Sequence, residues 1–423
     1  MFIIKSIEVE GFWGNSSIQV DLNPDVNIFI GKNGSGKTTF INLLEATLTG
    51  DVNRLSTYRF NKIKINLIES SHKRQIIVER NDVTNFILVK IGTSKFEFSM
   101  YDLNNIYRAQ FGYQHPRNYN QKLLKDRLGE LLGITYLSVH RNVIKKETDI
   151  IQDEQLGQQN PVDARLTDLM NRLLSYQLEL QSFVNDLSKQ FQRDILKLML
   201  YNPNYDVVKI DSFISIDFEK LKRGLTQAYK DLGLLDDEQK QNINHHLSII
   251  KRASDQINRY TNKEAQDLYV DDVTALTLMK RSEKIVELSS ALEYKRNEIF
   301  EPIDSYMRLI ADDFISNKTL KFSTGKKHDL VFTNDNKDFL PSQLSSGEKQ
   351  LLILFTEALL QKRSKSIFIA DEPELSLHIS WQRKVISTLQ LLNPNSQIIL
   401  ATHSPEIVGP LKSKTINMKD III

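Results

Sequence analysis

The stretch that decides the fold is "VNIFIGKNGSGKTTFINLLEATLTG", residues 26–50. Residues 26–30 form a nearly continuous apolar run, which suits a strand buried on both faces. "GKNGSGKT" (31–38) follows and matches the pattern G-x-x-x-x-G-K-[ST], and the residues after it predict a helix that Gly50 closes. On the order of 0.01 random matches to this pattern are expected in such a chain. Strand, loop and helix together predict a phosphate-binding loop.

The loop residues indicate how a nucleotide would be held. Backbone N–H groups in such a loop wrap the phosphates, the Lys37 ammonium reaches the β- and γ-phosphate oxygens, and the Thr38 hydroxyl ligates Mg²⁺. The alternative is a strand–helix turn that merely requires glycine. The predicted nucleotide-binding residues of this loop are Gly31, Asn33, Gly34, Ser35, Gly36, Lys37, Thr38 and Thr39.

Two further motifs place polar residues at strand ends. "SIFIADEP" (366–373) ends an apolar strand with Asp371 and Glu372, where ligands bind in parallel α/β sheets. Asp371 can hold Mg²⁺, and Glu372 can accept a proton from an attacking water. "ILATHSP" (399–405) ends another strand with His403, which beside a nucleotide can hydrogen-bond the γ-phosphate or position the water. Taken singly, these motifs also fit a solvated acidic turn and a structural histidine.

A second phosphate-facing turn lies far from the first along the chain. "QLSSGEKQ" (343–350) opens the helix "LLILFTEALLQ". The first N–H groups of a helix are unpaired and its dipole favours negative charge, so this turn is also suited to an anion. One chain therefore carries two such turns, and it is open which phosphate the second one faces.

The order of predicted elements indicates an α/β fold. Strands and helices alternate at both ends of the chain, which favours one parallel sheet built from the two ends. The segment between them is polar and helical in period, with Leu173, Leu180 and Leu187 near a heptad seam. A helical bundle or short antiparallel coiled coil is favoured over a long projecting one. We expect an N-terminal lobe with a small antiparallel sheet at 1–145, a helical insertion at 146–315 and a C-terminal lobe at 316–423.

Composition excludes several classes of site. The 423 residues carry a net charge of +2, with 26% charged and 40% hydrophobic residues, so charge alone gives no argument for nucleic acid. The absence of cysteine excludes disulfides, thiolate metal sites and cysteine nucleophiles. We see no signal peptide and no apolar run long enough to cross a bilayer, and expect a cytoplasmic protein without a membrane partner.

The order of these motifs resembles that of the ABC-type ATPases of the SMC/RecF/OLD branch. The phosphate loop comes first and is followed by the long insertion, "LSSGEKQ", "FIADEPELSLH" and "ATHSP". The resemblance covers roughly residues 1–60 and 316–423. It implies an ABC-ATPase head with Walker A, signature, Walker B, D-loop and H-loop motifs, which hydrolyses ATP. It also implies Mg²⁺ held by Thr38 and Asp371, and catalytic roles for Lys37, Glu372 and His403.

The same resemblance gives the second turn a partner. In that family two heads meet head to tail, and the "LSSGE" turn of one caps the γ-phosphate held by the other. This implies a homodimer or higher oligomer with composite ATP sites, in which "ELSLH" (374–378) is the loop that crosses to the partner. The residues that would act on the partner's nucleotide are Ser345, Ser346, Gly347 and Glu348.

Two positions depart from the family pattern or stay open. The family usually offers a glutamine to the metal after a central strand, whereas this chain has "SVHRN", so His140 or Arg141 takes that place. An adenine ring could stack on Phe12 or Trp13 in "GFWGN", although core packing is favoured for Phe12.

The likeness extends to antiphage-defence ATPases, namely PtuA of Septu and retron systems and AriA of PARIS systems, through "FWG", "LSVHR", "LPSQLSSGEKQLLIL" and "DEPELSLHISWQ". It implies a regulatory ATPase that holds or releases a separate effector protein, such as a nuclease of HNH or Toprim type. We see no nuclease motif in the chain itself. The alternative is a RecF- or SMC-like ATPase that clamps DNA. Basic clusters at 71–75, 280–284 and 324–328 could contact phosphates, although such runs are usually solvated.

Overall fold

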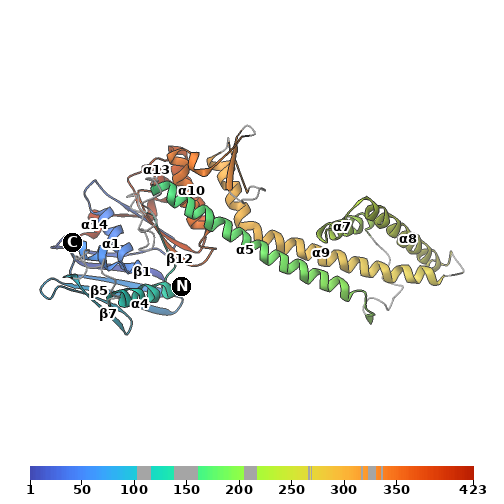
Figure 1. Cartoon of the computed structure of the whole chain (residues 1–423), viewed down its shortest axis with the longest axis horizontal. Coiled ribbons are helices and arrows are strands. Elements are labelled where there is room, and N and C mark those ends of the chain that lie inside the picture. Colours follow the sequence, from blue (N-terminus) through green and yellow to red (C-terminus); the bar gives the residue numbers. More distant parts are fainter. Residues whose placement is uncertain are drawn as a thin grey trace. The chain divides into compact units, whose positions relative to one another are not determined.

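The computed structural model divides the chain into two compact units. The first comprises Met1–Leu174 and Pro302–Ile423, and the second Ser175–Glu301. Helices α5 (Pro161–Lys197) and α9 (Val270–Leu309) contribute residues to both (Figure 1). His140, Arg141 and the basic cluster 324–328 lie outside the described residues. The structure describes residues 1–101, 116–137, 161–203, 217–264, 267, 269–315, 318–322, 330–334 and 337–423.

A five-stranded parallel sheet forms the centre of the first unit. Its order is β14-β3-β13-β12-β8, and every neighbouring pair is parallel. β3 comes from the N-terminal part of the chain and lies between two strands from the C-terminal part, so the predicted α/β fold built from both ends is confirmed. The carboxyl ends of parallel strands meet at one edge, where three of the predicted motifs therefore gather. The strands are β3 (Val26–Ile30), β8 (Ile134–Leu137), β12 (Ser366–Asp371), β13 (Ser396–Ala401) and β14 (Thr415–Asn417).

A six-stranded antiparallel sheet, in the order β2-β1-β4-β5-β6-β7, accompanies it. Buried and more exposed residues alternate along β4, which is typical of a sheet with one face in the core. On the other face, Lys64 pairs with Glu8 at 3.0 Å and Lys90 with Glu79 at 2.7 Å, so charges of both signs are interspersed there. The strands are β1 (Ile3–Phe12), β2 (Ser16–Asp21), β4 (Lys62–Glu69), β5 (His72–Asn81), β6 (Phe86–Ile91) and β7 (Ser94–Ser99).

A buried glutamine joins the two sheets. Gln397 of β13 is fully buried, and its Nε2 donates to the carbonyl oxygens of Ile4 and Asn23, each at 2.8 Å. The Ile4 N–H donates in return to Gln397 Oε1 at 2.8 Å. Because every polar atom of this amide has a partner, burying it is compatible with stability, and the side chain fixes β1 against β13.

Helix α1 (Lys37–Thr49) begins at the phosphate loop and contacts β8, β12, β13 and α4 (Pro116–Leu131) (Figure 1). Its apolar residues, among them Phe40 and Leu44, belong to one core with residues of both sheets. The helix ends as predicted at Gly50, whose φ of 67° is the left-handed cap conformation. Helix α2 (Val52–Thr57) follows directly.

The C-terminal part builds the helix that carries the second turn. Helix α10 (Ser346–Leu359) contacts β8 and α12 (Val385–Leu392). Buried and half-buried polar contacts fix it: Lys349 pairs with Asp163 at 2.6 Å, and Tyr306 and Thr356 share a hydrogen bond of 2.6 Å. The remaining elements are η3 (Ile310–Phe314), β9 (Thr319–Phe322), β10 (Leu330–Asn334), β11 (Lys337–Phe339), η4 (Pro341–Gln343), α11 (Ile379–Gln382), α13 (Pro405–Val408), η5 (Gly409–Lys414) and α14 (Met418–Ile421).

The second unit is helical. Helices α7 (Phe218–Asp231) and α8 (Asp237–Thr261) pack with α9 in one apolar cluster, and α5, α7 and α9 share another around Phe191 and Leu292. A Cβ atom at Gly224 would lie 2.3 Å from Val286, so glycine is what lets α7 approach α9 this closely. None of the described helices is both long and apolar enough to cross a lipid bilayer.

Candidate active site

The loop between β3 and α1 has a backbone that requires glycine. Gly34 has a φ of 76° and Gly36 a φ of 90°, conformations that side chains with a Cβ atom rarely adopt. At Gly36 a Cβ atom would also lie 2.9 Å from the indole of Trp13. Both glycines are therefore needed where a phosphate loop of this pattern would place them.

Lys37 provides a buried positive charge in the loop. Its Nζ donates to the carbonyl oxygens of Gly31 at 2.9 Å and Lys32 at 3.3 Å. Burial lowers the pKa of Lys37, and the charges of Glu372, Asp371 and Glu374 oppose that shift. The lysine thus lies within electrostatic reach of the acidic residues at and just after the end of β12.

Thr38 and Asp371 are brought together from positions far apart in the sequence. The Thr38 hydroxyl donates to Asp371 Oδ1 at 3.3 Å, and Asp371 is the last, buried residue of β12. A hydroxyl and a carboxylate are oxygen ligands of the kind that Mg²⁺ takes beside phosphate. The pair predicted to hold a metal therefore fits that ion in its chemistry.

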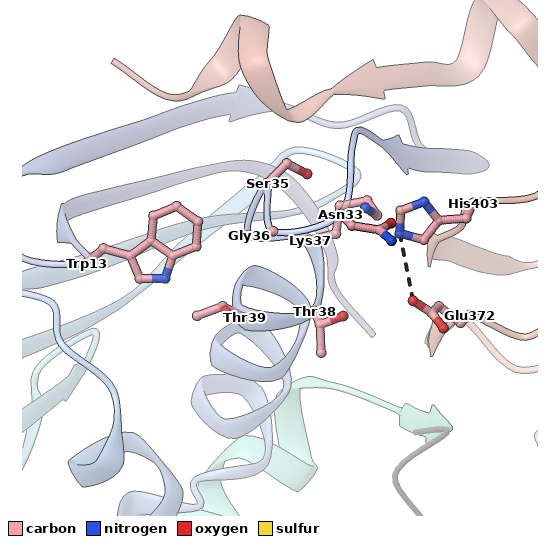
Figure 2. A pocket seen from close by; sticks show the side chains of 10 residues that line it. Trp13, Asn33, Ser35, Gly36, Lys37, Thr38, Thr39, Glu372 and His403 are labelled. Atoms are coloured by element: carbon pink, nitrogen blue, oxygen red, sulfur yellow. Dashed lines mark ion pairs between the residues drawn. The ribbon is translucent and has the colours of Figure 1, made fainter.

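Glu372 and His403 face each other beside the loop (Figure 2). The distance from His403 Nε2 to Glu372 Oε1 is 3.8 Å, and both side chains are about one third exposed, at 37% and 31%. Glu372 has a φ of 47°, and its N–H donates to the Ala401 carbonyl at 2.8 Å. Such a conformation costs on the order of 1–3 kcal/mol in a residue other than glycine, and residues of this kind cluster at functional sites.

These groups line one cavity of about 490 Å³, a volume within the usual range for ligand sites. The Ser35 hydroxyl in the loop is buried and has no hydrogen-bond partner among the described residues. A phosphate oxygen would supply one, so the loop fits a phosphate group. The lining residues are Trp13, Asn33, Gly34, Ser35, Gly36, Lys37, Thr38, Thr39, Glu372 and His403.

The structure separates the two aromatic candidates. Trp13 lines the cavity and is 49% exposed, whereas Phe12 is 1% exposed and belongs to the core. The two rings stack with centroids 4.8 Å apart. In Figure 2 the indole lies on the opposite side of the loop from Glu372 and His403, where it offers a flat surface.

The residues predicted to form the signature turn, Ser345 to Glu348, do not line this cavity. Ser345 caps α10: its N–H and hydroxyl donate to Glu348 Oε2 at 2.9 and 2.8 Å. Burial alone would raise the pKa of Glu348, but hydrogen bonds from Lys318 and Ser345 outweigh it and lower that pKa. Glu348 thus serves the helix cap in this structure, while Ser346 is exposed at the helix start.

Gly347 is buried against the segment 374–378. A Cβ atom at Gly347 would lie 2.4 Å from the carbonyl oxygen of Ser376. Ser376 itself has a φ of 69°. The first turn of α10 and the segment predicted to cross to a partner are therefore in direct contact within one chain.

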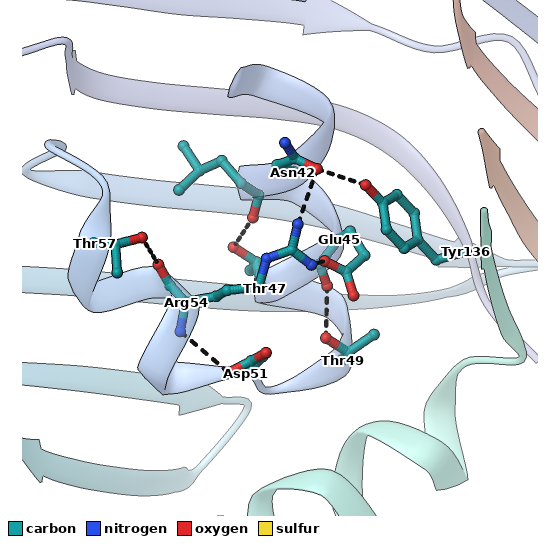
Figure 3. A network of polar contacts seen from close by, with 9 residues as sticks. Asn42, Glu45, Thr47, Thr49, Asp51, Arg54, Thr57 and Tyr136 are labelled. Atoms are coloured by element: carbon teal, nitrogen blue, oxygen red, sulfur yellow. Dashed lines mark hydrogen bonds and ion pairs between the residues drawn. The ribbon is translucent and has the colours of Figure 1, made fainter. Parts of the chain in front are cut away.

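A polar network that the sequence did not reveal lies at the other end of α1 (Figure 3). Arg54 Nη2 and the Tyr136 hydroxyl both donate to Asn42 Oδ1, at 2.9 and 2.5 Å, and Arg54 also pairs with Glu45. Burial raises the pKa of Glu45 to about 7, against the opposing charge of Arg54. The network ties α1 to β8, the strand that precedes His140 and Arg141.

The fold is that of an ATPase domain, and the residues gathered at this site are compatible with that class. The chain belongs to the AAA ATPase domain family, which matches residues 1–408. It is 22% identical to the Retron Ec83 probable ATPase of Escherichia coli, over 98% of this chain and 70% of that protein.

Two more relatives support the predicted resemblance to defence ATPases, which is confirmed. The Retron Vc95 probable ATPase of Vibrio cholerae serotype O1 biovar El Tor is 26% identical over 60% of this chain and 49% of that protein. Septu protein PtuA of Bacillus thuringiensis is 28% identical over 26% of this chain and 32% of that protein. The match thus spans about half the length of the Vibrio cholerae relative.

Proposed function

We propose that this chain binds ATP with Mg²⁺ in the cavity beside the phosphate loop and hydrolyses it. The observation that carries the proposal is the convergence of Lys37, Thr38, Glu372 and His403 on one cavity of about 490 Å³, with Asp371 hydrogen-bonded to Thr38. The family supports the activity at the level of the ATPase domain.

Each residue has a role that its position allows. Lys37 and the loop N–H groups bind the β- and γ-phosphates, and Thr38 and Asp371 hold Mg²⁺, which would neutralise phosphate charge. Glu372 accepts the proton of the attacking water as a general base. His403, 3.8 Å from Glu372, orients that water or hydrogen-bonds the γ-phosphate.

The exposed indole of Trp13 is proposed to support the adenine ring. An aromatic side chain can stack on any base through its flat face. Its position on the far side of the loop from Glu372 leaves the triphosphate to extend between them (Figure 2).

A second copy of the chain is proposed to complete the site. Ser345, Ser346 and Gly347 are absent from the lining of the cavity in their own chain. Ser346 is exposed at the start of a 14-residue helix, where unpaired N–H groups and the helix dipole favour a phosphate. A head-to-tail dimer, or a higher oligomer built from the same contact, would bring this turn onto the γ-phosphate held by the partner.

The biological role is proposed from the relatives. Proteins named as retron probable ATPases and Septu PtuA match the chain, and we therefore propose a role in antiphage defence. In this role, ATP at the subunit interface would hold or release a separate effector, such as an HNH or Toprim nuclease. Co-purification of a neighbour-encoded protein, and the mass of that complex with and without ATP, test the effector. DNA affinity that falls steeply with salt would instead favour a DNA clamp.

Mixing two inactive variants tests the composite site. Lys37→Ala weakens the phosphate loop and Ser346→Arg blocks the signature turn, so each alone should hydrolyse ATP poorly. In a mixed dimer one pocket combines the intact loop of one chain with the intact turn of the other. Half of randomly formed dimers are mixed and each has one intact pocket of two, so recovery should reach up to about a quarter of parental turnover.

Co-expression with two different tags ensures that mixed dimers form and can be isolated. As a control, the double variant Lys37→Ala/Ser346→Arg is mixed with parent protein in the same way. It shows how much ATP turnover a dimer loses when one of its two chains carries both substitutions. Parental turnover by Ser346→Arg alone, or no recovery in isolated mixed dimers, would contradict the composite site.

A further inference from the structure

One acidic residue outside the predicted site holds the backbone around His403. Glu374 is the first residue of the segment 374–378, and its Oε1 accepts hydrogen bonds from Thr402 Oγ1 at 2.7 Å, the His403 N–H at 2.8 Å and the Ser404 N–H at 3.2 Å. We propose that Glu374 is a positioning residue that fixes His403 beside Glu372 and joins it to the segment 374–378. This inference rests on the proposed ATPase function.

The three bonds leave the backbone at His403 little freedom. Hydrogen bonds to a carboxylate are stronger than those to a neutral acceptor, and two of these come from consecutive N–H groups on either side of the residue. The Thr402 hydroxyl also accepts from the Ser404 N–H at 2.9 Å, so the donors are themselves connected. A side chain whose main chain is held in this way keeps its direction when nucleotide enters.

A second connection joins the other end of the segment to the same turn. The Ser404 hydroxyl donates to Gln382 Oε1 at 2.6 Å, and Gln382 Nε2 donates to the Leu377 carbonyl at 2.9 Å. Glu374 and Leu377 are thus both linked to the residues after β13. A displacement of the segment, as docking of a second copy would cause, would reach His403 by two routes.

A purely structural role explains the arrangement less well. The other carboxylate oxygen, Glu374 Oε2, is buried and has no hydrogen-bond partner among the described residues, which is costly for a group that only fastens a loop. Two residues with left-handed backbones, Glu372 and Ser376, flank it. Backbone strain of this kind persists where the surrounding structure needs it, as at functional sites.

A double-mutant cycle on the full chain tests the positioning role. Glu374→Ala should lower kcat by roughly 10²-fold, the loss that a misplacement of about 1 Å produces. The affinity for Mg-ATP should change by less than about 3-fold, because the contacts of Lys37 and Thr38 stay in place. In a His403→Ala background, Glu374→Ala should lower kcat by less than about 3-fold more, since both act through one side chain.

Two companion variants guard against a general effect on folding. Glu374→Gln keeps an oxygen acceptor and should recover part of the lost kcat. Thr402→Val removes one hydrogen-bond donor at nearly constant volume. It should lower kcat by less than Glu374→Ala does, and this loss of kcat should also disappear in the His403→Ala background. If Glu374→Ala does not fold, Thr402→Val tests the positioning role in its place. Glu406, whose partly exposed carboxylate pairs with Arg383 at 2.6 Å, is the matched control, and Glu406→Gln should keep the parental kcat.

The outcomes separate the two proposals. If the losses in the double variants multiply, the positioning role is overturned. The ATPase function still stands in that case, provided that the parent hydrolyses ATP and that Glu372→Gln abolishes the hydrolysis. A parent chain that does not hydrolyse Mg-ATP, or a Glu372→Gln variant that does so at the parental rate, would overturn the ATPase function itself.

Discussion

Replacing Gly347 by alanine tests the contact between the signature turn and the segment 374–378. The added Cβ atom would lie 2.4 Å from the Ser376 carbonyl oxygen and 3.4 Å from the Trp381 ring. The neighbour at 2.4 Å is main chain, so relief requires a backbone shift. Overpacking of this kind costs about 1–3 kcal/mol, and the better helix propensity of alanine offsets at most about 1 kcal/mol. We expect a net destabilisation of about 1–2 kcal/mol.

Thermal unfolding and ATP turnover measure the effect. The melting temperature should fall by roughly 1–3 °C, and turnover should fall with it because the shift moves both the turn and the segment. Gly129 in α4 is the matched control, since an added Cβ atom there has no neighbour within 4 Å. Gly129→Ala should gain about 0.5–1 kcal/mol. If Gly347→Ala melted as high as Gly129→Ala and kept parental turnover, the contact would not be a rigid one.

Three further changes address the cavity and the network at α1. Glu372→Gln removes the proton acceptor, so turnover should fall by about 10²–10⁴-fold while ATP stays bound and ATP-dependent assembly persists in native mass measurements. Trp13→Ala should weaken ATP binding by roughly 10-fold, through the loss of base stacking, but leave the affinity for inorganic tripolyphosphate unchanged; equal losses for both would argue against stacking. The pKa of Glu45 is raised to about 7, so its protonated form stabilises the fold at low pH and that stability is lost as pH rises through 7. Relative to Glu45→Gln, the parent should lose about 2.5 kcal/mol of unfolding free energy between pH 5 and pH 8, and a constant difference would contradict this.

The phosphate loop, Asp371, Glu372 and His403 could be predicted to meet because each motif ends a strand. Once a parallel sheet is inferred from the alternation of strands and helices, its strand ends share one edge, and no further information is needed. The signal in each case is local: a short apolar run followed by glycines, carboxylates or a histidine. The separation of Ser345 to Gly347 from this cavity could not be read in that way, because it depends on how α10 packs.

Glu374 and the network around Asn42 escaped prediction for a different reason. Glu374 acts on residues around position 403, and Tyr136 lies 94 residues from the Asn42 side chain that it contacts. Each of these residues is ordinary in its own stretch of sequence, and only tertiary packing gives it a partner. For the adjacent Phe12 and Trp13 the sequence favoured core packing of Phe12, and the structure agrees, because the Phe12 ring is buried and the Trp13 ring lines the cavity.

The segment 374–378 contacts both parts of the proposed catalytic apparatus within one chain. Glu374 binds the backbone at His403, which serves the chain's own cavity, and Ser376 packs on Gly347, which begins the turn proposed to close the partner's cavity. If a second copy docks on this segment, closure of one pocket therefore affects closure of the other pocket. Independent pockets would give about a quarter of parental turnover in the mixture of Lys37→Ala and Ser346→Arg. Because each mixed dimer contains one pocket that cannot close, the contacts of this segment predict a recovery below that value.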